Sequence, residues 1–238
     1  MSVKKVKILY IRSLRDVVMN RIMVFAPHPD DDILGCGGSI AKHAAQGHQV
    51  ITVFMTSGEA GSLSYSRDEL GRLRENEARQ AAALLGVKDT VFLGNPDGFL
   101  EFNRDNLISI MTLLRSQKPD AVYLPHHLDG NEDHRVTNKL VLDACRRAGG
   151  PWFPECPGDP WGVKTILAYE IWTPLQEVSY IEDITPYMEL KLDALRLHAS
   201  QLKDIQYDEA ISGLNRYRGI MSGQGRYGEC FQVIKAEL

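Results

Sequence analysis

Two segments of the sequence combine histidine with several carboxylates, a set of side chains that can bind a divalent metal ion. The first segment, residues 27–32, reads Pro-His-Pro-Asp-Asp-Asp and contains His28, Asp30 and Asp31. Three adjacent carboxylates repel one another, and a bound cation would relieve that repulsion. The same acidic run could instead cap a following helix, because aspartate suits a helix N-terminus. Taken alone, this segment supports the two interpretations about equally.

The second segment, residues 124–135, is richer in such side chains. Within nine residues it holds three histidines and three carboxylates, namely His126, His127, Asp129, Glu132, Asp133 and His134. Imidazole and carboxylate without thiolate suit zinc, and also iron, manganese or nickel. A catalytic zinc needs three protein ligands and an open position for water. Two histidines and one aspartate would provide those ligands and leave a second aspartate to act as a base.

Both segments lie between an expected strand and an expected helix. Apolar runs predict strands at residues 22–26, 49–56, 90–94, 121–125 and 165–173. Helical periodicity with Gly or Pro stops predicts helices at residues 33–47, 68–86, 104–118, 132–150 and 188–202. This alternation indicates an α/β, Rossmann-like fold, with a mainly parallel β-sheet flanked by helices on both faces. Functional groups in such sheets follow the carboxyl ends of strands, so both segments are expected at one edge.

Composition narrows the classes of function. The chain has 238 residues, 44% of them hydrophobic, which suits a single domain over residues 1–238. The net charge of −4 comes without a basic patch, which argues against nucleic acid or an anionic membrane as partner. No apolar run approaches the roughly 18 residues of a membrane span, and residues 1–19 are interpreted as an N-terminal extension. The four cysteines form no Cys-x-x-Cys pair, as expected of free thiols in the cytoplasm.

The motifs and their order resemble those of the PIG-L/LmbE family of zinc-dependent de-N-acetylases. Two of these motifs are the histidine-aspartate segments already described. The third is a helix of the form Lys-x-x-Ala-x-x-x-His-x-Ser-Gln, and the fourth begins with Arg-Gly and ends with Tyr-Gly-Glu-Cys-Phe. They lie at residues 28–31, 129–134, 191–201 and 218–231. The resemblance therefore covers about residues 20–238.

The resemblance implies a role for several residues of the first two motifs. His28, Asp31 and His134 would bind zinc, although other divalent metals suit the same ligands. Asp30 would act as the general base that takes a proton from the attacking water. Asp133 would orient a metal ligand or Asp30 without touching the metal itself.

The proton donor is the least defined role in this scheme. Many family members have a histidine three residues before the last metal ligand, where this sequence has Asn131. Asparagine can donate a hydrogen bond to an oxyanion, but it cannot donate a proton near neutral pH. That leaves Asp30, once protonated, or His198 as the proton donor. Two further residues, Arg74 and Asp97, are candidates for substrate binding, although a solvated helix face and an ordinary turn explain them equally well.

The resemblance implies a hydrolase that removes the acetyl group from an N-acetylated sugar, either an N-acetylglucosaminyl compound or a chito-oligosaccharide. Relatives often form trimers or hexamers, so a homo-oligomer is expected. An alternative is a metal-dependent hydratase or lyase that adds water to an unsaturated carboxylate at the same site. A pocket with several arginines and lysines would favour that alternative. A non-catalytic metal-binding module is a third possibility, and a base beside the ligands counts against it.

Overall fold

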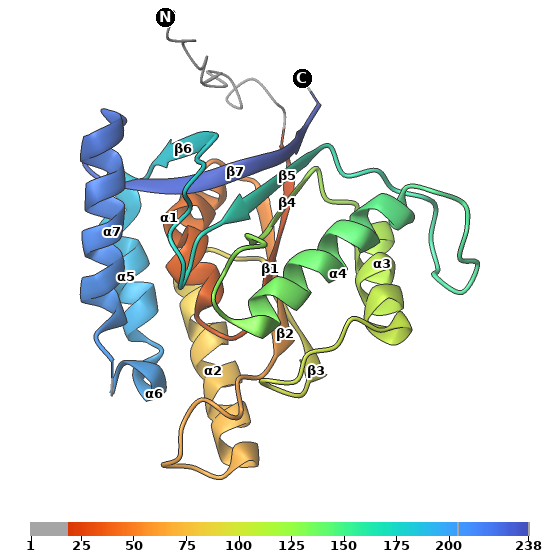
Figure 1. Ribbon diagram of the computed structural model, residues 1–238, viewed down its shortest axis with the longest axis horizontal. Helices are drawn as coiled ribbons and strands as arrows, with labels where there is room; N and C mark the ends of the chain where they lie inside the picture. Colours follow the sequence, from red (N-terminus) through yellow and green to blue (C-terminus); the bar gives the residue numbers. More distant parts are fainter. Residues whose placement is uncertain (1–18, 204, 238) are drawn as a thin grey trace, which may run out of the picture.

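A seven-stranded sheet lies at the centre of the molecule, with helices packed on its two faces (Figure 1). The computed structural model describes residues 19–203 and 205–237. Its strands are β1 (Arg21–Ala26), β2 (Gln49–Thr56), β3 (Asp89–Asn95), β4 (Ala121–Pro125), β5 (Thr165–Tyr169), β6 (Tyr180–Asp183) and β7 (Gly228–Ala236). The helices of the described residues are α1 (Asp31–Ala45), α2 (Arg67–Leu85), α3 (Arg104–Gln117), α4 (Glu132–Ala148), α5 (Met188–Arg196), α6 (Ala199–Leu202) and α7 (Tyr207–Ser222), with a 3-10 turn, η2, at Thr185–Tyr187.

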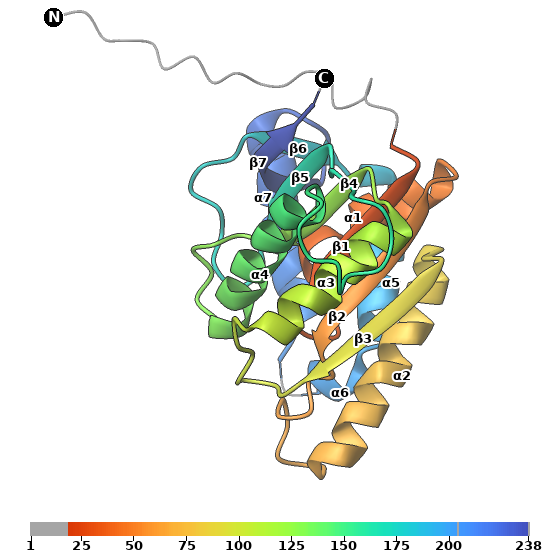
Figure 2. The same cartoon turned by 90° about the vertical axis from the view of Figure 1, so that its right-hand side faces the viewer.

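The sheet is mainly parallel. Its strands lie in the order β3-β2-β1-β4-β5-β7-β6, and β7 runs antiparallel to both of its neighbours. Helices α1, α2 and α5 cover one face, and α3 and α4 cover the other (Figure 2). Strand β1 is therefore buried on both sides: Ile22 and Val24 pack into one core, and Met23 and Phe25 into the other. The predicted α/β fold with helices on both faces is confirmed.

The neighbouring strands β1 and β4 decide where a site can form. From β1 the chain builds outward to β2 and β3 on one side, then returns to build β4 and β5 on the other. The loops after β1 and β4 therefore open where the strand order reverses, which is where open α/β sheets bind ligands. These loops are the two histidine-aspartate segments of the sequence.

The C-terminal third departs from the sequence prediction. The single helix expected over residues 188–202 is two helices, α5 and α6, which separate next to His198. The strand expected over residues 165–173 ends at Tyr169, because the backbone that follows turns to donate hydrogen bonds to Asp129. Helix α7 and strands β6 and β7 were not predicted.

The expected N-terminal extension, residues 1–19, lies outside the described residues except for Met19. Met19 is buried and packs into the core beneath α1. Among the helices that the structure describes, none has the length and apolar character needed to cross a bilayer.

Candidate metal centre

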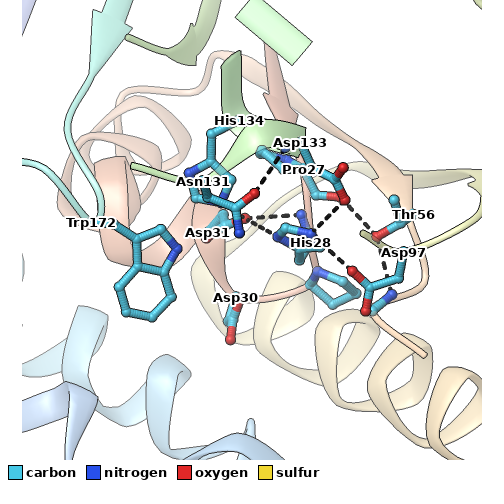
Figure 3. Close-up of polar contacts among 12 residues, drawn as sticks. Pro27, His28, Asp30, Asp31, Thr56, Asp97, Asn131, Asp133, His134 and Trp172 are labelled. Atoms are coloured by element: carbon cyan, nitrogen blue, oxygen red, sulfur yellow. Dashed lines mark hydrogen bonds and ion pairs between the residues drawn. The ribbon is translucent and has the colours of Figure 1, made fainter. Parts of the chain in front are cut away.

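Three side chains converge between the ends of β1 and β4 (Figure 3). The Oδ2 atom of Asp31 lies 3.0 Å from Nδ1 of His28 and 3.2 Å from Nε2 of His134. One possible ligand atom from each residue lies within 4.8 Å of the other two. All three residues are buried. The structure thus brings together the three ligands predicted from the sequence.

A tight turn after β1 presents the first two of these side chains. His28 follows the strand, and Asp31 begins α1. Between them, Asp30 adopts a φ of 124°, a backbone conformation that side chains other than glycine rarely adopt. The N–H and the hydroxyl of Thr56 both donate to the carbonyl of Pro27, at 3.1 and 3.0 Å. The end of β2 therefore holds this strained turn in place.

Each of the two histidines directs its second ring nitrogen at another carboxylate. Nε2 of His28 lies 3.1 Å from Asp133 and 3.1 Å from Asp97. Nδ1 of His134 lies 3.2 Å from Oδ1 of Asp129. Carboxylates placed in this way orient a metal-binding histidine and increase its basicity. Of these three aspartates, only Asp133 was expected in this position from the sequence.

The contacts of Asp97 differ from the substrate contact that was expected. The sequence suggested a contact with substrate, but one carboxylate oxygen faces His28 and the other accepts a hydrogen bond from the N–H of Ala60 at 2.8 Å. Asp97 is 7% exposed, so little of it can reach a ligand in the solvent. This position favours orientation of His28 over a contact with sugar hydroxyls.

Asp129 is a functional candidate that the sequence analysis missed. Its Oδ2 accepts hydrogen bonds from the N–H groups of Trp172 and Thr173, at 3.0 and 3.2 Å. Its Oδ1 accepts one from the N–H of Asn131 at 3.0 Å and also faces His134. The buried carboxylate therefore joins the loop after β4 to the loop after β5. Its position at the start of the second acidic turn was the available signal.

Negative charge exceeds positive charge around the two histidines. Burial by itself would lower the pKa of His134, but Asp31 and Asp129 outweigh burial and raise that pKa to about 9. Burial also opposes ionisation of Asp31, yet His134 and His28 hold the pKa of that carboxyl well below its usual range. In a metal-free protein, protons on the histidines balance this charge. A divalent cation would balance it in their place.

The surroundings of His134 indicate whether a cation would fit between His28, Asp31 and His134. Both of its ring nitrogens are buried, and neither makes a hydrogen bond of acceptable geometry, although each lies 3.2 Å from a carboxylate oxygen. Buried polar atoms in proteins rarely lack a partner, so a nitrogen left unsatisfied beside Asp31 suits a metal ligand. Two imidazole nitrogens and one carboxylate oxygen also match the protein ligands of a catalytic zinc. The residues present therefore fit such an ion.

Asp30 precedes the ligand candidate Asp31 in the same turn, and it is also buried. Burial raises its pKa to about 7, and the nearby Asp31 adds to this effect while Arg74 opposes it. The guanidinium of Arg74 lies 3.3 Å from Asp30 and donates to the carbonyls of Pro29 and Gly58, at 2.6 and 3.0 Å. Arg74 is only 3% exposed. Its guanidinium is engaged in holding the turn at Asp30 and is not free for the substrate contact that was expected.

The two remaining candidates lie in different surroundings. Asn131 caps α4 through its Oδ1, which accepts a hydrogen bond from the N–H of Asp133 at 2.9 Å, and its amide lies beside Asp31 (Figure 3). His198 is fully buried, and neither of its ring nitrogens has a hydrogen-bond partner among the residues that the structure describes. Burial lowers the pKa of His198 to about 3, so the ring is neutral near pH 7. A neutral ring argues against His198 as the proton donor and favours Asp30 for that role.

A family model described as "PIG-L: GlcNAc-PI de-N-acetylase" matches residues 23–145, which is more than half of the chain. The chain belongs to the PIG-L family. The matched PIG-L region begins within β1 and ends within α4, so it includes both loops that form the site. The resemblance inferred from the four sequence motifs is therefore confirmed.

Individual relatives extend this PIG-L likeness over nearly the whole chain. The diacetylchitobiose deacetylase of Thermococcus kodakarensis is 31% identical over 228 residues, which is 91% of this chain and 84% of the relative. The structure of N,N'-diacetylchitobiose deacetylase from Pyrococcus horikoshii, complexed with its inhibitor MPG, superposes with a TM-score of 0.86 at 31% identity, covering 94% of this chain and 86% of that one. The 4-carboxy-2-hydroxymuconate hydratase GalB from Pseudomonas putida superposes with a TM-score of 0.84 at 23% identity, over 92% and 98% of the chains. At that identity, the likeness to GalB concerns the fold alone.

Proposed function

We propose that this PIG-L protein is a zinc-dependent N-deacetylase, in which His28, Asp31 and His134 hold the metal and Asp30 is the general base. The observation that carries the proposal is the convergence of two imidazole nitrogens and one carboxylate oxygen within 4.8 Å. A second, buried carboxylate beside these ligands is unnecessary for a structural metal site, but a hydrolase requires a base in that position. This combination favours an enzyme over a non-catalytic metal-binding module.

A zinc ion held by these residues would polarise the amide carbonyl and lower the pKa of water from 15.7 towards about 7. Asp30 accepts a proton from the attacking water, and its pKa of about 7 suits a group that both takes and returns a proton near neutral pH. The same residue then protonates the departing amine. His198 stays neutral in this scheme, as its burial requires.

We assign to Asn131 the stabilisation of the negative charge that develops on the carbonyl oxygen. The helix cap uses its side-chain oxygen, so its amide nitrogen is available as a donor. One such donor contributes about 10²–10³-fold to the rate in other hydrolases. The amide cannot release a proton, so proton delivery to the amine remains with Asp30.

The substrate that we propose is a saccharide with an N-acetylglucosamine unit. The diacetylchitobiose deacetylases that resemble the chain over most of its length support this class. An aromatic side chain also lies beside the site: Trp172 is 46% exposed, its ring centre is 6.5 Å from that of His134, and it contacts Tyr207 edge-on at 5.3 Å. Half-exposed aromatic rings of this kind provide an apolar face on which a sugar ring can stack.

The hydratase alternative has less support. A site that binds a substrate with carboxylates needs free cationic groups. Among the described residues, Arg74 is the arginine that contacts Asp30. Its guanidinium already contacts Asp30 and two backbone carbonyls, and the side chain is buried. The likeness to the hydratase GalB does not offset this, because it extends to the fold only.

The proposal also includes a cytoplasmic location and a homo-oligomeric state, either a trimer or a hexamer. Free, buried thiols at all four cysteines support a reducing compartment. The oligomeric state rests on the family resemblance and is tested by light scattering of the purified full-length chain. A monomer at micromolar concentration would refute it.

An acetate-release assay tests the activity. The zinc-loaded protein is incubated with N-acetylglucosamine, diacetylchitobiose and an N-acetylglucosaminyl inositol, and in parallel with an unsaturated carboxylate whose absorbance reports hydration. We expect acetate from at least one sugar, loss of that activity in Asp30→Asn, and full activity in the control Asp105→Asn, an exposed residue in the first turn of α3. Hydration without acetate release would favour the alternative function, and an active Asp30→Asn variant would refute the assigned base.

A further inference from the structure

Helix α1, which begins with the metal-ligand candidate Asp31, is interrupted after its first turn. Cys36 has φ −148° and ψ 25°, which is not a helical conformation. The helix therefore consists of a short first segment, residues 31–35, and a longer second segment, residues 37–45. A break of this kind leaves carbonyls of the first segment and N–H groups of the second without partners inside the helix.

A buried ion pair satisfies both sides of this break. Nζ of Lys191 donates to the carbonyl of Leu34 at 3.0 Å, which closes the first segment. The carboxylate of Glu229 accepts the N–H groups of Gly38 and Ser39, each at 2.8 Å, which caps the second segment. Lys191 and Glu229 contact each other at 2.7 Å, and both are 0% exposed.

The two members of the pair come from distant parts of the chain. Lys191 lies on α5 and Glu229 on β7, and they belong to the third and fourth sequence motifs. A further residue, Asn215 on α7, accepts from Lys191 at 2.9 Å and donates to the carbonyl of Gly228 at 3.0 Å. The pair therefore ties α5, α7 and β7 to the one point at which α1 changes direction.

The first segment, residues 31–35, is also held by close packing, which leaves it little freedom to move. A Cβ atom on Gly35 would lie 2.1 Å from the ring of Tyr169, so the segment packs directly against β5. The hydroxyl of Tyr169 in turn donates to the carbonyl of Phe25 at the end of β1, at 2.7 Å. Leu34, which Lys191 holds, lies one helical turn after Asp31. A shift at the break would therefore be transmitted to the ligand.

We propose that Lys191 and Glu229 are positioning residues, which set the direction of the segment that carries Asp31 and so determine how tightly the site binds its metal. The inference rests on the metal site of the proposed function. It gives Lys191 and Glu229, which belong to the third and fourth motifs, a role that is distinct from substrate contact and from proton transfer. A purely structural ion pair would affect unfolding and leave metal affinity unchanged.

The test measures zinc affinity of the folded full-length chain by competition with a chromophoric chelator, and the visible absorption of the cobalt-substituted protein. The variants are Lys191→Met, Glu229→Gln and the double variant. The double variant removes both charges, so it leaves no unpaired charge buried at this point. We expect each to bind zinc about 10–100-fold more weakly, as is typical when support for a ligand is lost. The cobalt spectrum should also change in shape, which reports altered ligand geometry.

A matched control separates lost positioning from lost stability. Arg115 on α3 is also buried, at 3% exposed, and its guanidinium donates to four backbone carbonyls, those of Ala148, Gly150, Phe153 and Cys156. Arg115→Met should destabilise the fold and leave zinc affinity within about twofold, since distant sites act independently.

If the single variants fail to fold, the double variant decides the question, because it removes both charges together. A folded double variant with wild-type zinc affinity and an unchanged cobalt spectrum would overturn the inference. If the wild-type protein bound no zinc, the proposed function itself would fail, and the two results cannot be confused.

Discussion

Oδ1 of Asp129 lies 3.2 Å from Nδ1 of His134, while Oδ2 of the same carboxylate binds two backbone N–H groups after β5. The last metal-ligand candidate is thereby oriented by a residue outside the proposed ligand set. The orientation depends on a loop that follows a different strand.

This contact predicts the effect of Asp129→Asn. The amide keeps the size of the side chain but removes the charge that favours a basic, correctly oriented imidazole. We expect zinc affinity to fall about 10–100-fold, with a smaller loss of thermal stability. Chelator competition measures the affinity, and Asp105→Asn on α3 serves as the control. Unchanged affinity in Asp129→Asn would show that His134 needs no such partner.

The ligand assignment predicts that His28→Ala and His134→Ala each lose tightly bound zinc. Each change removes one of three protein ligands, and two remaining ligands do not hold a catalytic zinc. The control is His127→Ala, an exposed histidine in the same segment as His134. Metal analysis after dialysis should find zinc in the control and in neither ligand variant. Full zinc occupancy in both ligand variants would exclude these residues as ligands.

Arg74→Met should move the pH dependence of the reaction in a defined direction. Arg74 opposes the rise that burial causes in the pKa of Asp30, so its loss should raise that pKa further above about 7. A base with a higher pKa is protonated over more of the pH range, and the acid limb of kcat/KM should shift upward. The control is Arg72→Met, an exposed position on the same helix. A downward or absent shift in Arg74→Met would contradict the assignment of Asp30 as the base.

Zinc binding should weaken as the pH falls. The pKa of His134 in the metal-free protein is raised to about 9, so zinc must displace a proton there below that pH. Affinity should therefore rise with pH by up to about tenfold per unit for each proton displaced, and the contribution of His134 should level off near pH 9. The raised pKa also stabilises the metal-free fold fully below pH 6.5, and this contribution is lost as pH rises through 9. Calorimetry in buffers of different ionisation enthalpy counts the released protons, and a count of zero at pH 7 would refute the prediction.

A buried histidine far from the metal centre predicts part of the acid sensitivity of the fold. Burial lowers the pKa of His43 to about 3, and its Nε2 contacts the hydroxyl of Tyr123 at 2.9 Å. The unfolded chain therefore binds a proton that the fold excludes, and stability should decline as pH falls from 6.5 towards 3. His43→Gln should flatten this decline in denaturant titrations, whereas the exposed control His127→Gln should not. An equally steep decline in His43→Gln would contradict the assignment.

The sequence by itself determined the alternation of strands and helices and the identity of the three ligand candidates. Apolar runs such as residues 22–26 can be buried only between two layers, and the spacing of His28 and Asp31 places both on one turn. These features depend on neighbours in the chain, and local patterns are therefore sufficient to predict them. The same holds for the short motif that ends in His134.

Only the tertiary structure decided what the other polar residues do. The sequence left Arg74 either as a substrate contact or as a solvated residue of a helix face, yet packing of α2 against the first loop buries it beside Asp30. Lys191 and Glu229 have partners on strands or helices that are remote in the sequence, and Asp129 has partners in the loop after β5. The order and register of the strands bring those elements together, and a pattern along the chain does not contain that information. For this reason local motifs were enough to predict the ligand candidates and Asp133, whereas the roles of Asp97, Asp129, Lys191 and Glu229 depend on the tertiary structure.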